Sequence, residues 1–298
     1  MLRAQVVSLV VFASLAGAYP ASAQLTTGDG LLVNTQWLAQ HQKDKDLVIL
    51  TVGPESGYKK EHIAGSHFVQ LNDIATKVPG GLALEMPSEA DLRSAFEKLG
   101  ISDQSRIVVV FDSGWVTPAS RVFLTLGYAG FANQAMYLDG GTTAWRKAGL
   151  PLTAETAAVG PGRITKSMLP AIIVGHEYVG GVSKNPKAKL LDARAPAAYT
   201  RATAGQEAPG HIPGAANLPW GTLWDESTDL ILPKAELEKK FRAVGVQPGD
   251  TVVGYCHVGQ YATAMLLAAR VLGHPVRLYD GSFQDWTMRK LPTEGGGQ

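Results

Sequence analysis

The chain has 298 residues, and its 27 lysines and arginines nearly balance its 26 aspartates and glutamates, for a formal net charge of +1. This balance, without any basic run, argues against a nucleic-acid partner. Hydrophobic residues make up 45% of the chain, which is ordinary for a globular protein with a substantial core. Beyond residue 23, no apolar stretch is long enough to cross a membrane.

Residues 1–23 have the three parts of a secretory signal peptide. Arg3 supplies a positive charge, residues 6–18 are apolar, and Ala21-Ser22-Ala23 is a small-residue cleavage site. An uncleaved membrane anchor is the alternative, but the apolar stretch is shorter than the roughly 20 residues that a span requires. We therefore expect a periplasmic or secreted protein of roughly 275 residues without stable membrane insertion, a length that suits two domains.

Residues 28–152 alternate strand-like and helix-like segments. The runs at 47–52 and 106–111 are almost continuously apolar and rich in β-branched residues, as buried strands are. The run at 91–99 carries apolar residues at helical spacing and ends before Gly100. This alternation predicts βα units that build a mostly parallel sheet covered by helices on both faces.

Residues 164–292 repeat the same order of elements. Strand-like runs occupy 190–194 and 251–255, and helix-like runs occupy 236–244 and 263–272. The shared landmarks keep their spacing, because the pairs Asp139 and Asp280, and Trp145 and Trp286, are each 141 positions apart. The chain therefore reads as a diverged tandem repeat.

The segment 153–163 between the two repeats is rich in Ala, Gly and Pro and is the expected linker. The predicted fold class is α/β, with two tandem domains at 28–152 and 164–292. Each domain is expected to contain a mostly parallel sheet flanked by helices.

Cys256 is the one cysteine of the chain, and it stands where the run at 251–255 ends. A short loop with a glycine and then a helix-like run follow, so backbone N–H groups and a helix N-terminus converge near the sulfur. Those donors stabilise an anion and hence the thiolate. A leftover cysteine in an exported protein indicates a reactive thiol or an intermolecular partner. A buried structural cysteine is the alternative, but active sites of such sheets lie at the carboxyl ends of strands.

The first repeat lacks this chemistry. Asp112 stands where the second repeat has its thiol, and a carboxylate there cannot act as a sulfur nucleophile and repels an anionic substrate. Thr51 and Gly53 stand where the second repeat has Asp192 and Arg194. We therefore expect the first repeat to have a structural or interface role.

Four segments of the chain together resemble the rhodanese family, the thiosulfate and 3-mercaptopyruvate sulfurtransferases. They are Leu191-Asp192-Ala193-Arg194, Gly210-His211-Ile212-Pro213-Gly214-Ala215-Ala216-Asn217, the loop from Cys256 to Ala262, and Asp280-Gly281-Ser282 with Trp286. The resemblance covers nearly all of the chain after the signal peptide. It implies tandem rhodanese-like domains, of which the N-terminal one is inactive and the C-terminal one catalytic.

The resemblance also implies a mechanism in which Cys256 takes a sulfane sulfur from a donor such as thiosulfate. The sulfur is held as a persulfide and passed to cyanide or a thiol, with no metal or organic cofactor. The expected partners are these small molecules, and a monomer is favoured. His41, His62, His67, His176 and His274 do not form metal-ligand spacings.

The loop after the thiol is the expected substrate-binding site. Its backbone N–H groups are expected to hold the terminal sulfur of the persulfide; they belong to His257, Val258, Gly259, Gln260 and Tyr261. The resemblance implies a substrate-binding arginine in the region of Arg201. Asp192 and Arg194 are expected to brace the loop through an ion pair or a hydrogen-bond network.

The donor and two other function classes stay open. The loop has neither the cationic residues of thiosulfate-specific family members nor the small polar residues of mercaptopyruvate-specific ones. A cysteine phosphatase or arsenate reductase needs Cys-x5-Arg to hold a tetrahedral oxyanion, and Ala262 stands at the arginine position. A non-catalytic rhodanese-like module that carries sulfur or binds a partner is the remaining alternative.

Overall fold

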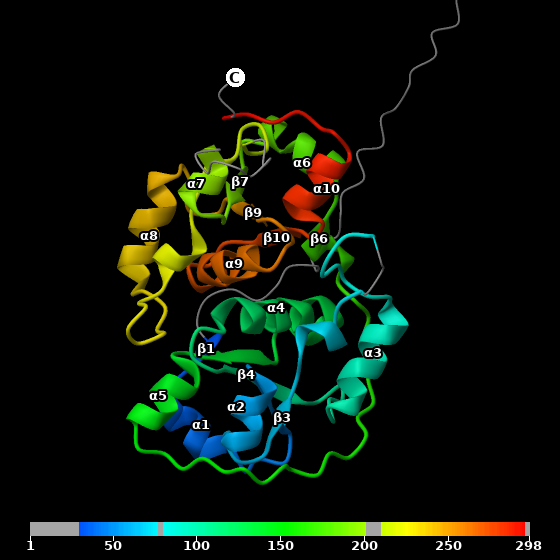
Figure 1. Cartoon of the computed structure of the whole chain (residues 1–298), viewed down its shortest axis with the longest axis vertical. Helices are drawn as coiled ribbons and strands as arrows, with labels where there is room; N and C mark the ends of the chain where they lie inside the picture. The colour runs from blue at the N-terminus through cyan, green and yellow to red at the C-terminus, as the bar shows by residue number, and fades with distance from the viewer. Residues whose placement is uncertain (1–29, 77–79, 201–209, 296–298) are drawn as a thin grey trace, which may run out of the picture.

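A computed structural model describes residues 30–76, 80–200 and 210–295, so the expected signal peptide and Arg201 lie outside the described residues. Two parallel five-stranded sheets form the framework, each flanked by helices (Figure 1). Their strand orders are β1-β5-β4-β2-β3 and β6-β10-β9-β7-β8, which is one topology used twice. The α/β fold class and the tandem repeat predicted from the sequence are confirmed. We call each sheet with its helices the first lobe and the second lobe.

The elements of the first lobe are β1 (Leu32–Val33), α1 (Thr35–His41), β2 (Leu47–Val52), α2 (Glu55–Lys60), β3 (Ser66–Phe68), α3 (Glu89–Lys98), β4 (Arg106–Phe111), α4 (Val116–Leu126), β5 (Ala135–Leu138) and α5 (Gly141–Lys147). Those of the second lobe are β6 (Ile173–Val174), α6 (His176–Gly180), β7 (Ala188–Asp192), α7 (Pro196–Thr200), β8 (Ala216–Asn217), α8 (Lys234–Ala243), β9 (Thr251–Tyr255), α9 (Tyr261–Val271), β10 (Val276–Tyr279) and α10 (Ser282–Met288).

The central strands form where the sequence is most apolar. β2 and β4 pair in parallel along their whole length, and β9, which is central in the second sheet, has four of its five residues buried. The strand predicted at 190–194 is β7, which begins two residues earlier and ends at Asp192. Its register with β9 sets this range, because Ala188 pairs with Thr251 and Asp192 with Tyr255.

The two tryptophans that marked the repeat have equivalent roles in the two lobes. The indole N–H of Trp145 donates to the carbonyl of Pro151 at 3.0 Å, and that of Trp286 donates to the carbonyl of Pro292 at 2.7 Å. Each bond ties α5 or α10 to the chain that follows it. The two tryptophans that lie 141 residues apart therefore form equivalent hydrogen bonds in the two lobes.

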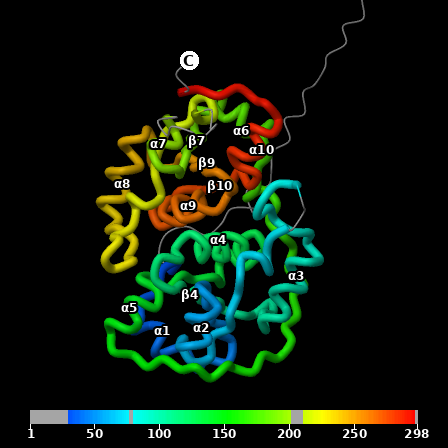
Figure 2. The backbone as a smooth tube through the Cα atoms, in the orientation of Figure 1, coloured from blue at the N-terminus to red at the C-terminus, as the bar shows by residue number. Residues whose placement is uncertain are grey.

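The lobes meet through α4 and α9, which face each other across the interface (Figures 1 and 2). Both helices are buried along almost their whole length, and one continuous apolar cluster includes residues of both. The hydroxyls of Ser120 and Thr263 are hydrogen-bonded across the interface at 2.8 Å. After α5 the chain runs without regular structure along the first lobe, where Gly162 N–H donates to the carbonyl of Glu97 at 2.8 Å.

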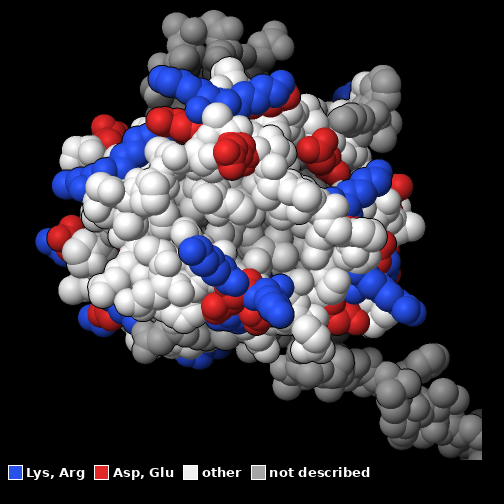
Figure 3. All heavy atoms as spheres, turned by 90° about the horizontal axis from the view of Figure 1, so that it is seen from below, with Lys and Arg blue, Asp and Glu red and all other residues white. Residues whose placement is uncertain are grey.

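The face of the first lobe that is seen from below carries positive and negative side chains interspersed among uncharged residues (Figure 3). Neither sign dominates this face, in keeping with the near-neutral net charge of the chain. Among the described residues, none of the helices combines the length and the apolar character that spanning a bilayer requires.

Candidate active site around Cys256

Cys256 follows the last residue of the central strand β9 and precedes a short loop and α9. The residue is 1% exposed, and the chain next to it comes to the surface at His257 and Tyr261. α9 begins at Tyr261, two residues before the helix predicted from the sequence. The thiol therefore lies at the carboxyl edge of the sheet, between a strand end and a helix start, where parallel α/β folds place their ligands.

The loop presents a row of unused backbone donors. Within the described part of the chain, the N–H groups of His257, Val258, Gly259 and Gln260 have no hydrogen-bond acceptor. Gly259 has φ +79°, and a Cβ there would lie 2.6 Å from the carbonyl oxygen of Asp280, so the loop requires glycine at this position. Successive N–H groups in such a turn form a concave site for an anion.

The turn that leads into α10 forms hydrogen bonds with the backbone of Cys256. The backbone N–H of Cys256 donates to Ser282 Oγ at 3.2 Å, and this hydroxyl donates to the carbonyl of Tyr279 at 2.8 Å. The N–H of Phe283 returns a bond to the carbonyl of Cys256 at 3.0 Å. Ser282 has φ +53°, a strained conformation for a residue other than glycine. The sequence marked Ser282 as part of a motif but gave no sign that it bonds to Cys256.

Asp192 and Arg194 form a buried ion pair next to β9. Arg194 Nε lies 3.0 Å from both carboxylate oxygens of Asp192, and Nη2 lies 2.6 Å from Oδ2. The guanidinium also donates to the carbonyl of Gly210 at 2.8 Å, and its carbon lies 4.0 Å from the centre of the Phe283 ring. Burial opposes the charge of Arg194, but its hydrogen bonds and ion pair with Asp192 outweigh burial and raise the arginine pKa. The pair thus links the end of β7 to the start of α10.

The remaining predicted residues differ in their surroundings. The side chain of Gln260 turns toward the first lobe, where its Nε2 donates to Thr117 Oγ1 at 2.9 Å. Tyr261 is 45% exposed, and its ring centre lies 5.8 Å from that of Trp220. Arg201 lies outside the described residues, so its place relative to Cys256 stays a prediction.

His211 has the surroundings of a structural residue. Its ring stacks on Tyr199 with centres 3.7 Å apart, and Nδ1 lies 3.1 Å from the Tyr199 carbonyl. In the first lobe, His62 stacks on Tyr58 in the same way, with centres 3.8 Å apart. The same arrangement in the lobe that lacks the thiol argues for a role in holding the turn.

The turn at Asp112 in the first lobe differs from the loop at the thiol. One Asp112 carboxylate oxygen accepts from Ser113 N–H at 3.0 Å and from Thr142 Oγ1 at 2.8 Å. The N–H of Trp115 is bonded to the Asp112 carbonyl at 2.9 Å. α4 begins after three intervening residues, whereas four separate Cys256 from α9. Two of the three residues in this shorter turn, Ser113 and Trp115, donate their N–H groups to Asp112, so the turn has no comparable row of unused donors.

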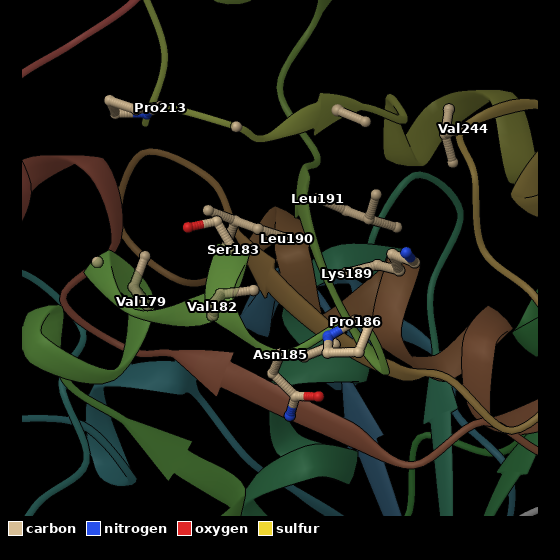
Figure 4. Close-up of a pocket in the computed structure, with 14 residues that line it drawn as sticks. Val179, Val182, Ser183, Asn185, Pro186, Lys189, Leu190, Leu191, Pro213 and Val244 are labelled. Carbon is tan, nitrogen blue, oxygen red and sulfur yellow. The ribbon is translucent and has the colours of Figure 1, made fainter.

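In the described part of the chain, cavities lie away from the thiol. One of about 210 Å³ lies beside β7, and Lys189 is the one charged residue among those that line it (Figure 4). Another of about 430 Å³ lies at the carboxyl edge of the first sheet, against Trp115, Pro118 and Gln260. Cys256 lines neither cavity. Nowhere in the described ranges do three His, Cys, Asp or Glu side chains come together as a metal site would need.

A model of the rhodanese-like domain matches residues 34–148 and again residues 177–289. The 3-mercaptopyruvate sulfurtransferase of Escherichia coli is 29% identical over 278 residues, covering 88% of this chain and 97% of that protein. The thiosulfate sulfurtransferase of Gallus gallus is 30% identical over 247 residues, covering 79% of this chain and 81% of that protein.

Solved structures agree with the sequence comparison. The crystal structure of SseA from Escherichia coli, a 3-mercaptopyruvate sulfotransferase described as having the rhodanese fold, matches with a TM-score of 0.74 and 26% identity. The match covers 85% of this chain and 98% of that one. Because the domain model matches both lobes over most of their length, the chain belongs to the rhodanese family.

Proposed function

We propose that the protein is a sulfurtransferase that carries sulfur as a persulfide on Cys256. The observation that carries this proposal is the row of unused N–H groups that begins directly after the one thiol of the chain. The named relatives, a 3-mercaptopyruvate and a thiosulfate sulfurtransferase, support sulfur transfer as the reaction class. Since both kinds of donor occur among these relatives, the physiological donor stays open.

The first half-reaction forms the persulfide. The thiolate of Cys256 attacks the outer sulfur of the donor, a new S–S bond forms, and the bond between that sulfur and the donor breaks. With thiosulfate, the electron pair leaves on sulfite. The terminal sulfur of the persulfide then carries the negative charge, and the N–H groups of His257 to Gln260 stabilise it.

The second half-reaction returns the free enzyme. A nucleophilic acceptor such as cyanide attacks the terminal sulfur, and thiocyanate leaves while the electron pair of the S–S bond returns to Cys256 as a thiolate. The scheme is ping-pong, because the donor product leaves before the acceptor reacts. We also propose that Arg201 binds the donor and that Asp192 and Arg194 support the loop.

We propose the same division into signal peptide, domains and linker that the sequence predicts. Residues 1–23 are a signal peptide, 28–152 an inactive domain, 153–163 a linker and 164–292 the catalytic domain. We propose a periplasmic or secreted monomer. Comparing intact mass from the periplasmic fraction with that of the full sequence tests the signal peptide.

A pair of activity assays tests the proposed function. Purified protein without residues 1–23 is supplied with thiosulfate and cyanide, or with 3-mercaptopyruvate and a thiol. Turnover with either pair supports the proposal, and the ratio of the two kcat/KM values identifies the preferred donor. If neither pair turns over while Cys256 is reduced, the passive sulfur-carrier or partner-binding module is the better account.

The first lobe is expected to stay inactive when it is given a thiol. In an Asp112→Cys/Cys256→Ser double variant we expect no turnover above that of Cys256→Ser alone. The new thiol would follow a turn that is one residue shorter and whose Trp115 N–H is already bonded. Measuring thiosulfate-dependent thiocyanate release checks this. Turnover within about tenfold of the wild type would show that the first turn can hold a persulfide.

A further inference from the structure

We propose that Arg121, on α4 of the first lobe, is a positioning residue for the loop after Cys256 in the second lobe. This inference rests on the proposed function for its meaning in catalysis. It gives the lobe without a thiol a defined part in the reaction. Arg121 is 1% exposed. Its side chain extends from the first lobe to the loop after Cys256, at Gly259, and to the turn before α10, at Asp280.

The guanidinium of Arg121 has three partners on different segments. Nη1 forms an ion pair with Asp280 Oδ1 at 2.5 Å and donates to the carbonyl of Gly259 at 3.3 Å. Nη2 donates to the carbonyl of Leu84 at 2.6 Å. The other carboxylate oxygen of Asp280 accepts from Met86 N–H at 2.7 Å. Arg121 and Asp280 thereby join α4, the chain before α3, the loop after the thiol and the turn before α10.

The hydrogen bond from Arg121 to the Gly259 carbonyl fixes the direction of the Gln260 N–H, one of the unused donors of the loop. A trans peptide holds the Gly259 carbonyl and the Gln260 N–H in one plane, pointing in opposite directions. Because Arg121 holds the carbonyl, the N–H is directed away from the interface of the two lobes. The side chain of Gln260 is held from the same helix, through Thr117. The first lobe thus sets the orientation of this peptide.

The bond to Asp280 acts on the other side of the thiol. Asp280 lies two residues before Ser282, whose hydroxyl accepts the N–H of Cys256. The carbonyl of Asp280 also lies against Gly259, at the place where a Cβ would clash at 2.6 Å. Holding Asp280 therefore holds both the support of Cys256 and the surface on which the loop rests.

The repeat shows that this arginine is not a general requirement of lobe packing. Asp139 is the counterpart of Asp280, and it accepts from Ile231 N–H of the opposite lobe at 2.9 Å, as Asp280 accepts from Met86. Asp139 forms no ion pair among the described residues, and burial raises the pKa of its carboxyl. The carboxylate contact across the interface is thus duplicated, but in the described residues an arginine pairs with the carboxylate at Asp280 and not at Asp139.

The test separates positioning from stability by removing one charge and then both. Arg121→Met leaves Asp280 buried and unpaired, so both stability and kcat are expected to fall. Adding Asp280→Asn removes the unpaired charge, and an asparagine oxygen can still accept from Met86, so the thermal midpoint is expected to recover toward the wild type. We expect kcat of this double variant to stay on the order of 10- to 100-fold low, with KM changed much less, because the peptide of Gly259 has lost its anchor.

Matched controls are available at the same interface. Arg270 is 2% exposed, lies near the other end of α9 and places its guanidinium 4.9 Å from the centre of the Phe123 ring of the first lobe. Arg270→Met removes an equally buried arginine and is expected to lower stability while kcat stays near the wild-type value. Asp139→Asn changes the carboxyl of the repeat that lacks a thiol and is expected to leave kcat unchanged.

A second readout does not depend on sulfur transfer. The midpoint of the pH profile of iodoacetamide alkylation reports how strongly the loop stabilises the Cys256 thiolate, whereas exposure changes only the plateau rate. We expect a higher midpoint pH in the Arg121→Met/Asp280→Asn variant than in the wild type, although this variant loses both charges of the pair together. In a separate Arg121→Lys variant we expect a smaller rise of the midpoint pH. The other ionisable groups at this contact, Glu85, Asp285 and Arg289, are the same in all variants.

Two results would overturn the proposal. One is a double variant that regains wild-type kcat and alkylation midpoint together with its stability. The other is an Arg270→Met variant that loses as much kcat as Arg121→Met at equal stability. If the wild type transfers no sulfur, the proposed function fails, and the alkylation midpoints alone then decide whether Arg121 positions the loop.

Discussion

Replacing Cys256 by serine is expected to abolish sulfur transfer with both donors while the fold is retained. Serine is close to cysteine in size and fits a site that is 1% exposed, but its hydroxyl is a far weaker nucleophile and forms no persulfide. Loss of the sole nucleophile of an enzyme costs at least about 10⁴-fold in turnover. The measurement is thiocyanate release from thiosulfate and cyanide, with circular dichroism to verify the fold.

The control for this variant is Thr263→Ser, a change of similar size in α9 that keeps the hydroxyl bonded to Ser120 across the interface. It is expected to keep near-wild-type turnover. Turnover of a correctly folded Cys256→Ser protein within tenfold of the wild type would show that another group carries the sulfur, which would remove the basis of the proposed function.

Replacing Arg194 by methionine is expected to destabilise the second lobe by about 3–5 kcal/mol. The substitution leaves the carboxylate of Asp192 fully buried and without its partner, and breaking a buried pair from one side costs about this much. The carbonyl of Gly210 also loses its donor. Urea unfolding followed by circular dichroism measures the change in the free energy of unfolding.

Arg146→Met in the first lobe is the matched control. Its guanidinium pairs with Glu61 at 3.0 Å and with Asp112 at 3.4 Å, but the side chain is 39% exposed. Pairs exposed to this extent contribute about 0–1 kcal/mol, so this variant is expected to unfold almost like the wild type. Equal losses in the two variants would contradict the view that burial makes the pair at Arg194 important.

The central strands and the turn at the thiol could be predicted because their signal is local. The runs at 47–52, 106–111 and 251–255 are apolar enough to be recognised alone, and all three are strands with these bounds. For α3 and α8, which begin at Glu89 and Lys234, apolar spacing predicts a start two residues too late, because the first turn of each helix is mostly polar. Ser88, which caps α3 by accepting from a backbone N–H, marks such a start better than spacing does.

The interface side of the site could not be predicted. Arg121 lies in an apolar helix whose spacing indicates burial but not the partner, and Asp280 lies 159 positions further along the chain. Nothing local links them, because their contact exists only once the two lobes have packed through α4 and α9. Ser282 illustrates the same limit at shorter range, since its bond to Cys256 depends on the register of two neighbouring parallel strands, β9 and β10.

Intact-mass spectrometry after exposure to a sulfane donor tests the central claim most directly. Protein without residues 1–23 is mixed with thiosulfate or 3-mercaptopyruvate in the absence of an acceptor, and peptide mapping locates any added mass. We expect the gain of one sulfur atom on Cys256 and its loss as thiocyanate when cyanide is added. With no second cysteine in the chain, no internal thiol can convert the persulfide into a disulfide. An unchanged mass with both donors, while Cys256 is shown to be reduced, would contradict the proposed mechanism.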